Sequence, residues 1–201
     1  MRNLSKSILL IAFVTVSSFS VPSALGQVEV KKVEINPANG HSYYLLRGPK
    51  GKGISWTEGD VYARSIGGYL TAINDSAEND WILANFTGNA FGDLGDYYVW
   101  IGLSDEVIEG QFQWSSGEPL TFENWYSGEP NDYLDGEDYV HIYNFSGGNY
   151  AWNDNDPWVT DSDVFPFSAI AEVPNPAVPE SSTLLAGLGI GLIAFLRWLR
   201  R

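Results

Sequence analysis

The stretch Tyr98-Val99-Trp100-Ile101-Gly102-Leu103 marks the point at which the pattern of the chain changes. Before it, Ser55-Trp56-Thr57-Glu58 is typical of a capped helix start, and Asp75 to Glu78 begins a second predicted helix. After it, short aromatic strands such as Tyr139-Val140-His141-Ile142 alternate with long loops rich in Gly, Asp and Asn. Two helices followed by short strands and large loops predict an α+β domain.

A turn followed by a strand is expected over residues 40–46 and a short strand over 69–73, and Gly67-Gly68 ends the first helix. Its apolar face is predicted to consist of Trp56, Val61, Tyr62 and Ile66. The second helix carries the apolar residues Trp81, Ile82, Leu83 and Phe86. We expect four further aromatic residues to lie in the core: Trp100, Trp114, Trp125 and Trp152.

The charge of the chain excludes several classes of function. Its 201 residues include 25 acidic and 11 basic ones, for a net charge of −14, and no cysteine. Nucleic acid is therefore not expected as a partner, because its phosphates would be repelled, and disulfides and thiolate metal sites are impossible. Residues 65–196 hold 21 of the 25 acids and no Lys or Arg. This excess suits solubility, and it also suits calcium, which takes oxygen ligands.

The first 26 residues have the pattern of a secretory signal peptide. Arg2 and Lys6 precede a short apolar run, and Ala24-Leu25-Gly26 is typical of a cleavage site. An uncleaved anchor is the alternative. We therefore expect an exported protein, in the cell envelope or outside the cell.

The other end of the chain has a second targeting pattern. Residues 174–181 form a proline-rich spacer, and residues 182–201 an apolar segment that ends in arginines. This layout resembles the PEP-CTERM sorting tails of Gram-negative bacteria, which implies a membrane anchor processed by an exosortase-type transpeptidase. Ser181 stands where the second proline of that motif would be. A plain C-terminal membrane anchor is the alternative.

Residues 40–173, which follow a lead-in over 27–39, resemble a C-type lectin domain. The resemblance is carried by Trp100-Ile101-Gly102-Leu103, Glu129-Pro130-Asn131 and Trp152-Asn153-Asp154 in that order, and by the segment 67–73. Residues 105–112 resemble a loop of animal mannose-binding proteins. The family usually has two disulfides, whose positions are occupied here by Ala63 with Ala171 and by Tyr139 with approximately Pro157.

The resemblance implies calcium as the cofactor, at a principal site and at an auxiliary one. The principal ligands, which would also bind the sugar, are Glu129, Asn131, Glu137, Asn153 and Asp154. The auxiliary ligands are Asp105, Glu109, Asp132, Glu137 and Asp138. Pro130 is expected to follow a cis peptide bond.

The order Glu-Pro-Asn implies mannose- or glucose-type glycans, whose vicinal hydroxyls bind the calcium directly. Glu129 and Glu137 would accept hydrogen bonds from the sugar, and Asn131 and Asn153 would donate them. An extracellular matrix polymer is a related possible partner. Trp158 is a candidate for stacking on a sugar, although packing in the core is the other interpretation.

Three alternatives stay open from the sequence. The auxiliary acids can be merely solvated loop residues, and the domain can bind proteins or surfaces without sugar. A glycosidase with paired carboxylates is the third, but no feature singles out an acid that stays protonated. His41 and His141 are expected to be structural, and no nucleophile has a base beside it, so we do not predict an enzyme.

Overall fold

The structure is a computed structural model that describes residues 28–49, 52–87, 98–133, 136–146, 148–156 and 167–175. The predicted signal peptide 1–26, the tail 182–201, Pro157 and Trp158 lie outside these ranges. Within them, neither helix is long and apolar enough to cross a membrane.

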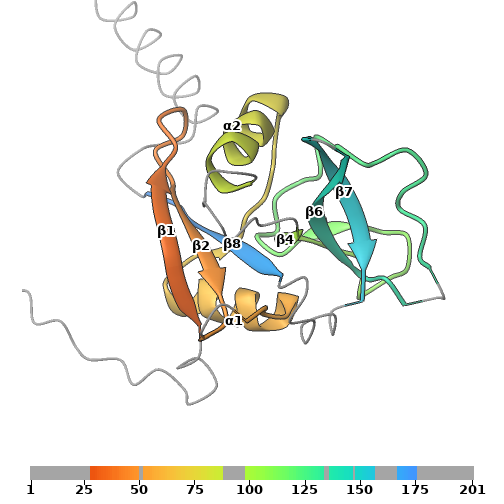
Figure 1. Cartoon of the computed structure of the whole chain (residues 1–201), viewed down its shortest axis with the longest axis horizontal. Coiled ribbons are helices and arrows are strands. Elements are labelled where there is room, and N and C mark those ends of the chain that lie inside the picture. Colours follow the sequence, from red (N-terminus) through yellow and green to blue (C-terminus); the bar gives the residue numbers. More distant parts are fainter. Residues whose placement is uncertain are drawn as a thin grey trace, which may run out of the picture.

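The fold is a mixed sheet with two helices, as the α+β prediction requires (Figure 1). The strand order is β1-β2-β8-β4-β6-β7, with β3 on β8 and β5 on β4, and every pair is antiparallel except β4 with β8. The described elements are β1 Glu29–Ile35, β2 Ser42–Arg47, α1 Trp56–Ser65, β3 Tyr69–Leu70, α2 Ser76–Phe86, β4 Tyr98–Ser104, β5 Gln113–Trp114, β6 Tyr139–Ser146, β7 Asn149–Asn155 and β8 Ser168–Val173.

The first helix begins where the sequence predicts. Ser55 is its N-cap, and a capping box joins the Ser55 hydroxyl to the Glu58 backbone N–H while the Glu58 carboxylate accepts from the Ser55 backbone N–H. The buried face differs from the prediction, because Gly59 and Ala63 are buried beside Trp56 whereas Val61 is 45% exposed. Small residues face the sheet because α1 approaches β8 closely. A Cβ built on Gly59 would lie 3.0 Å from the Ala169 Cβ.

The second helix is capped by Asp75, whose carboxylate accepts from the Glu78 backbone N–H at 2.9 Å. Ile82 and Phe86 are fully buried, and Trp81 and Leu83 are partly buried against the same core, as predicted.

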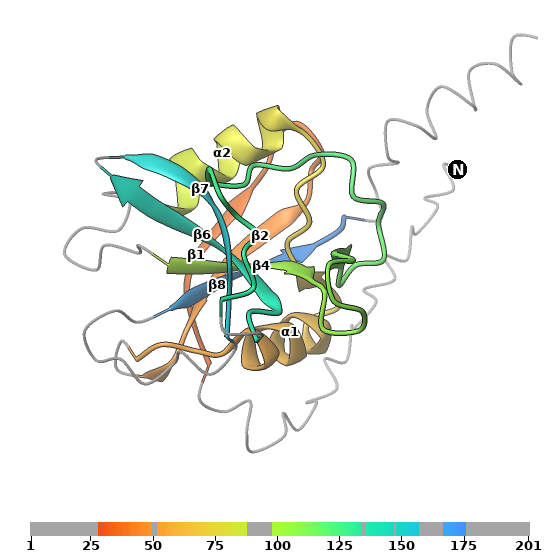
Figure 2. The same ribbon diagram turned by 90° about the vertical axis from the view of Figure 1, so that its right-hand side faces the viewer.

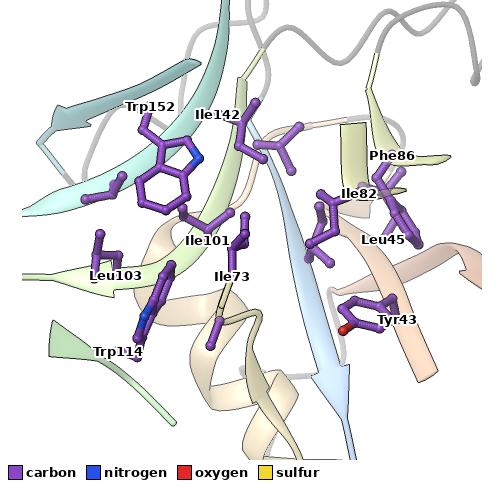
Figure 3. Packing of buried hydrophobic residues seen from close by; sticks show 14 residues of the cluster. Tyr43, Leu45, Ile73, Ile82, Phe86, Ile101, Leu103, Trp114, Ile142 and Trp152 are labelled. Carbon is purple, nitrogen blue, oxygen red and sulfur yellow. The ribbon is translucent and has the colours of Figure 1, made fainter. Parts of the chain in front are cut away.

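The two helices pack on opposite faces of the central strands β2 and β8. Successive side chains of a strand point to opposite faces. Tyr43 and Leu45 therefore join the core under α2, and Leu46 joins the core over α1. Figure 3 shows the core under α2. Phe86 of α2 lies on one side of it, and Trp152 of β7 and Trp114 of β5 lie on the other.

The predicted core tryptophans occupy these clusters. Trp100, Trp114 and Trp152 are at most 3% exposed, and Trp125 packs, partly buried, against the cluster that contains Trp114 and Trp152. Ala63 and Ala171, which the family resemblance implies stand at the positions of one disulfide, are both fully buried in the cluster over α1.

Strand β1 lies in the segment 27–39, where the sequence analysis predicts no strand. It pairs antiparallel with β2 and forms one edge of the sheet. The pairing register shifts between Val30 and Lys32, so the apolar residues of β1 do not alternate regularly along the sequence. Lysines and glutamates along it protect the edge from pairing with another chain.

The connection from β5 to β6 runs beside β7 and brings two distant segments together (Figure 2). Trp125 forms an isolated bridge with Trp152: the Tyr126 backbone N–H donates to the Trp152 carbonyl at 2.9 Å, and the Trp152 N–H donates to the Asn124 carbonyl at 2.8 Å. The loop after Tyr126 is thereby fixed next to the end of β7, where Asn153 and Asp154 lie.

Candidate functional site

The carboxylate of Asp154 holds the loop that follows Pro130 against β7. Its oxygens accept the backbone N–H of Asn131 at 3.1 Å and that of Asp132 at 2.9 Å. Asp154 is 1% exposed, and such charge-assisted hydrogen bonds are the strong kind. Asp132 has a φ of 45°, which turns the chain so that both N–H groups face one carboxylate.

The other predicted principal ligands lie around this contact. The Glu129–Pro130 peptide bond is cis, as predicted, and the Asn131 amide donates to the Glu129 carboxylate. The Glu137 carboxylate accepts the Tyr133 backbone N–H at 2.9 Å.

The side chain of Asn153, in β7, also forms a hydrogen bond within its own segment. Its amide donates to the carbonyl of Asp154, the next residue. All five predicted principal residues therefore come from two neighbouring segments, the loop 129–137 and β7.

Burial and the charge of neighbouring carboxylates both raise the pKa of the carboxyl groups at this site. Burial raises the pKa of Glu129, and the nearby charge of Asp154 raises it further. Burial also raises the pKa of Glu137, with contributions from Asp154 and Glu129, while the bond from Tyr133 acts in the opposite direction. Like charge among these carboxylates therefore favours their protonated forms, in the same direction as burial does.

The predicted auxiliary ligands form an adjoining group. Asp105 is 3% exposed; one of its oxygens accepts the Gly110 backbone N–H at 2.8 Å, and the other, Oδ1, is buried without a hydrogen-bond partner. Burial and the charge of Asp138 raise the pKa of Asp105. Burial, followed by the charge of Asp132, likewise raises the pKa of Asp138.

Glu109 lies on the exposed side of the same group. Its pKa is raised by partial desolvation and by the charges of Asp105, Asp132 and Asp138. The structure therefore brings the nine predicted ligands into two adjoining groups.

The donor set fits calcium chemically, because every side chain supplies oxygen and one buried oxygen lacks a partner. In the described part of the chain, no three His, Asp or Glu side chains converge closely enough to hold a metal ion. Their oxygens bond instead to amides and backbone N–H groups of the same loops. A cation at this place would draw the carboxylates together and relieve their repulsion.

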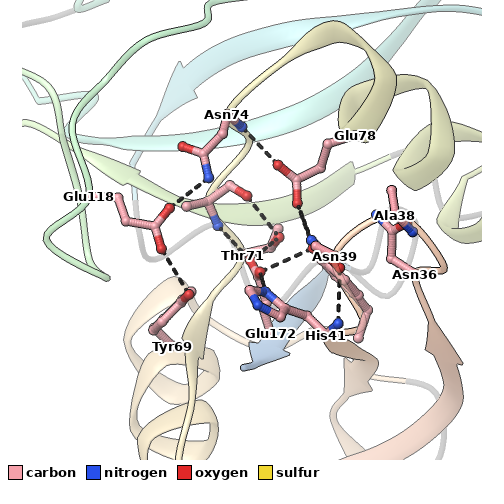
Figure 4. A network of polar contacts seen from close by, with 12 residues as sticks. Asn36, Ala38, Asn39, His41, Tyr69, Thr71, Asn74, Glu78, Glu118 and Glu172 are labelled. Atoms are coloured by element: carbon pink, nitrogen blue, oxygen red, sulfur yellow. Dashed lines mark hydrogen bonds and ion pairs between the residues drawn. The ribbon is translucent and has the colours of Figure 1, made fainter. Parts of the chain in front are cut away.

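A second polar cluster, which the sequence analysis did not predict, joins α2 to the sheet (Figure 4). Tyr43 donates to Glu78 at 2.5 Å and contacts Glu172 at 3.1 Å, and His41 pairs with the same Glu172 oxygen at 2.6 Å. Thr71 donates to the other Glu172 oxygen at 3.0 Å. The sequence signal was present: Glu172 is a lone acid in the apolar strand β8 and had to have buried partners.

The histidines are structural, as predicted. His141 is 1% exposed among the rings of Tyr98, Trp100 and Phe167, and burial lowers its pKa to about 3. A histidine that stays neutral inside an aromatic core does not transfer protons at neutral pH. His41 is 5% exposed and belongs to the Glu172 cluster.

Comparison with curated proteins gives relatives of about one third identity. A perlucin-like protein of Mytilus galloprovincialis is 34% identical over 107 residues, which are 53% of this chain and 64% of that protein. The low affinity immunoglobulin epsilon Fc receptor of Mus musculus is 32% identical over 112 residues, which are 56% of this chain and 29% of the receptor. The chain thus spans less than two thirds of either relative. An alpha-N-acetylgalactosamine-specific lectin of Patiria pectinifera is 30% identical over 120 residues, which are 58% of this chain and 67% of that protein.

Solved structures agree on the fold. Human lithostathine matches with a TM-score of 0.56 at 21% identity, covering 79% of this chain and 99% of that chain. The carbohydrate-recognition domain of the mouse scavenger receptor C-type lectin matches with a TM-score of 0.54 at 24% identity, covering 73% and 97%. The family model of the lectin C-type domain matches residues 52–161, which is more than half of the chain and includes all nine predicted ligands. The chain therefore belongs to the C-type lectin domain family.

Proposed function

We propose that this protein is a calcium-dependent carbohydrate-binding protein of the mannose/glucose type. The observation that carries the proposal is the pair of hydrogen bonds from the Asn131 and Asp132 backbone to Asp154. These bonds hold the Glu-Pro-Asn loop beside β7, and in this proposal side chains from both segments bind the same ligand.

The residues of the chain have distinct roles in this proposal. Glu129 and Glu137 accept hydrogen bonds from two neighbouring hydroxyls of a sugar, and Asn131 and Asn153 donate to the same hydroxyls. Calcium, when bound, supplies coordination positions for the two hydroxyl oxygens. Asp154 holds the loop and contributes negative charge from a buried position.

The proposal is tested by retention of the full chain on immobilised mannose and galactose. In calcium we expect retention on mannose that excess chelator abolishes; retention that the chelator leaves unchanged contradicts the proposal. Glu129→Gln combined with Asn131→Asp exchanges a donor for an acceptor across the site and should weaken mannose relative to galactose. Asp80→Asn, at an exposed acid on α2 that is not one of the predicted ligands, is the matched control and should retain the wild-type preference.

A second candidate is a domain that binds a protein or a matrix polymer without sugar. Three apolar side chains on the site loops favour it: Val107, Ile108 and Tyr133 are 77%, 49% and 68% exposed. Contiguous exposed apolar patches often mark contact surfaces, so these side chains would serve this function if they lie together. A glycan array in calcium separates the two candidates, because this second one predicts stabilisation by calcium with no sugar bound.

We also propose that the chain is exported and first anchored by its C-terminal segment, with exosortase-type processing of the tail. Support comes from the sequence patterns of residues 1–26 and 182–201. Mass measurement of the protein isolated from its native host tests both cleavages directly.

A further inference from the structure

Three apolar side chains of strand β1 are exposed: Val30, Val33 and Ile35 are 39%, 49% and 64% accessible. The alternation of a regular strand would place Val30 on the opposite face from Val33. The pairing register shifts between Val30 and Lys32, however, and such an irregularity inserts one residue and changes the phase of the strand. All three apolar side chains therefore lie on one face of the sheet, and we call them the β1 stripe.

The partners of these residues on β2 identify that face. Residues directly opposite each other in an antiparallel pair have their side chains on the same side of the sheet. Val30 is opposite Leu46, which lies in the core over α1, and Val33 is opposite Tyr44, which packs against that core. Lys32 lies on the other face, where its ammonium donates to a carbonyl at the end of α2 at 2.7 Å. The β1 stripe thus extends the core over α1 to the edge of the sheet, beyond the cover of that helix.

The most exposed residue of the β1 stripe lies close to the point where the chain leaves the sheet. Ile35 is opposite Ser42 of β2, and Ser42 is opposite Val173, the last residue of β8. Figure 1 shows these three strands side by side. Two strand spacings separate Ile35 from Val173, a distance of about 10 Å. The proline-rich spacer 174–181 follows directly, and the proposed membrane anchor 182–201 comes after it.

The length of the spacer limits how far the domain can lie from a membrane. A proline-rich segment extends by about 3.1 Å per residue, so residues 174–181 span about 25 Å. A tether this short gives the β1 stripe a high effective concentration at the bilayer, so that a weak apolar contact is sufficient. A second copy of the chain suits the stripe less well, because stable protein interfaces use roughly 20–30 residues a side and the stripe offers three.

The charges of β1 also permit contact with lipid. The whole chain has a net charge of −14, which anionic headgroups repel. Within β1, two lysines and two glutamates balance: Lys31 pairs with Glu29, and Lys32 Nζ lies 3.3 Å from Glu34 Oε1. The loops of the candidate site, by contrast, contain many acids and no Lys or Arg. Strand β1 therefore adds no net repulsion, whereas those loops do.

We propose that the β1 stripe lies against the surface of a lipid bilayer and orients the domain so that the candidate sugar site faces away from the membrane. This inference rests on the proposed C-terminal anchor and needs neither calcium nor sugar. Strands β1 and β7 are the two edges of the sheet, five strand spacings or about 24 Å apart (Figure 1). With β1 on the bilayer, the end of β7 and the loop 129–137 beside it lie on the far side of the domain.

The test uses single cysteines, because the chain has none of its own. Ile35→Cys places a label in the β1 stripe, and Tyr133→Cys, at a residue of the site loop that is 68% exposed, is the matched reporter on the other side. Each full chain carries a nitrobenzoxadiazole label and is reconstituted into phosphatidylcholine vesicles with and without a nitroxide-headgroup lipid. We expect the nitroxide to quench the label at position 35 and to leave the label at position 133 unquenched.

A further pair of variants tests whether the apolar side chains make the contact. Val30→Ser combined with Val33→Ser, in the labelled Ile35→Cys chain, should abolish the quenching. Val107→Ser, at a valine that is 77% exposed on another loop, is the matched control and should retain it. Because all three valines are exposed, these substitutions should leave the domain folded, which thermal unfolding checks.

Flotation of the chain with the vesicles separates this inference from the proposed anchor. A chain that does not float contradicts the anchor, and the role of the β1 stripe with it. A chain that floats but shows no quenching at position 35, or equal quenching at both positions, contradicts the role of the stripe alone. Energy transfer between donor- and acceptor-labelled Ile35→Cys chains, without quenching by the lipid, would mean that a second copy covers the stripe instead. Retention on mannose tests the sugar site independently of these results.

Discussion

The Asp154 carboxylate in β7 accepts the backbone N–H of Asp132 at 2.9 Å, across 22 residues of sequence. Through this bond the buried end of a β-hairpin fixes a loop whose side chains are partly exposed. Asp154 therefore serves the structure of the site even before any ligand binds, and its removal affects folding and binding together.

Replacing Asp154 by Ala should lower the free energy of unfolding by about 1.5–3 kcal/mol, because hydrogen bonds to a charged acceptor are lost. Denaturant unfolding of the full chain measures this value. Asp80→Ala removes an exposed acid on α2 and should change stability by less than about 0.5 kcal/mol. Equal effects of the two substitutions would show that Asp154 does not hold the loop.

Trp152 positions Asn153 and Asp154 by packing. It is fully buried and meets the rings of Trp114, Phe122 and Trp125 edge-on, with centroids 5.7–5.8 Å apart. Trp152→Ala should destabilise the domain by about 3–5 kcal/mol. Tyr133→Ala, at an aromatic residue that is 68% exposed, should change stability by no more than about 0.5 kcal/mol. Thermal unfolding compares the two, and a mild effect of Trp152→Ala would contradict the packing argument.

The sequence predicts local structure well where the signal is local. The caps at Ser55 and Asp75 depend on contacts three residues apart, and both are confirmed. The buried face of α1 is wrong at Val61 because Gly59 and Ala63 allow α1 to approach β8, a tertiary effect that helical spacing does not contain.

Long-range contacts explain what was missed. Glu172 stands out as the lone acid of β8, but its partner His41 is 131 residues away, so the local sequence does not identify the pair. The nine candidate ligand residues could be named because the family resemblance indicates which positions of the sequence correspond to them. Calcium binding by these residues is a prediction, which the calcium titration below tests.

Gly102 is required by close packing between strands. A Cβ at this position would lie 2.3 Å from the Leu70 carbonyl oxygen, which the backbone cannot easily move. We expect Gly102→Ala to destabilise the domain by about 1–3 kcal/mol. Gly136→Ala is the matched control, since a Cβ there meets no atom within 4 Å. The chemical denaturation midpoints should separate the two variants clearly, and identical midpoints would exclude the steric argument.

Glu78 should make stability depend on pH. Burial raises its pKa, and the charges of Glu172 and Asp75 add to the effect, while hydrogen bonds from Tyr43 and the Asn74 backbone oppose it. A raised pKa means that the folded state binds the proton more tightly than the unfolded state. The stabilisation is therefore complete below the unfolded pKa and is lost as the pH rises through the folded one.

The measurement is the free energy of unfolding of the chain and of Glu78→Gln as a function of pH. The advantage of the wild type over the variant should shrink as the pH rises from acid toward neutral. Asp80→Asn, an exposed position on the same helix, is the control and should follow the wild type. A difference that grows with pH would reverse the sign and contradict the prediction.

The most direct test of the central claim is a calcium titration of the full chain, followed by thermal unfolding with and without methyl α-mannoside. The account predicts that calcium raises the unfolding temperature and that the sugar raises it further in calcium than in chelator. A ligand at a hundred times its Kd adds about 2.7 kcal/mol, so even a weak site is measurable at high sugar concentration. An unfolding temperature that calcium does not change, or a sugar effect no larger in calcium than in chelator, would contradict calcium-dependent carbohydrate binding.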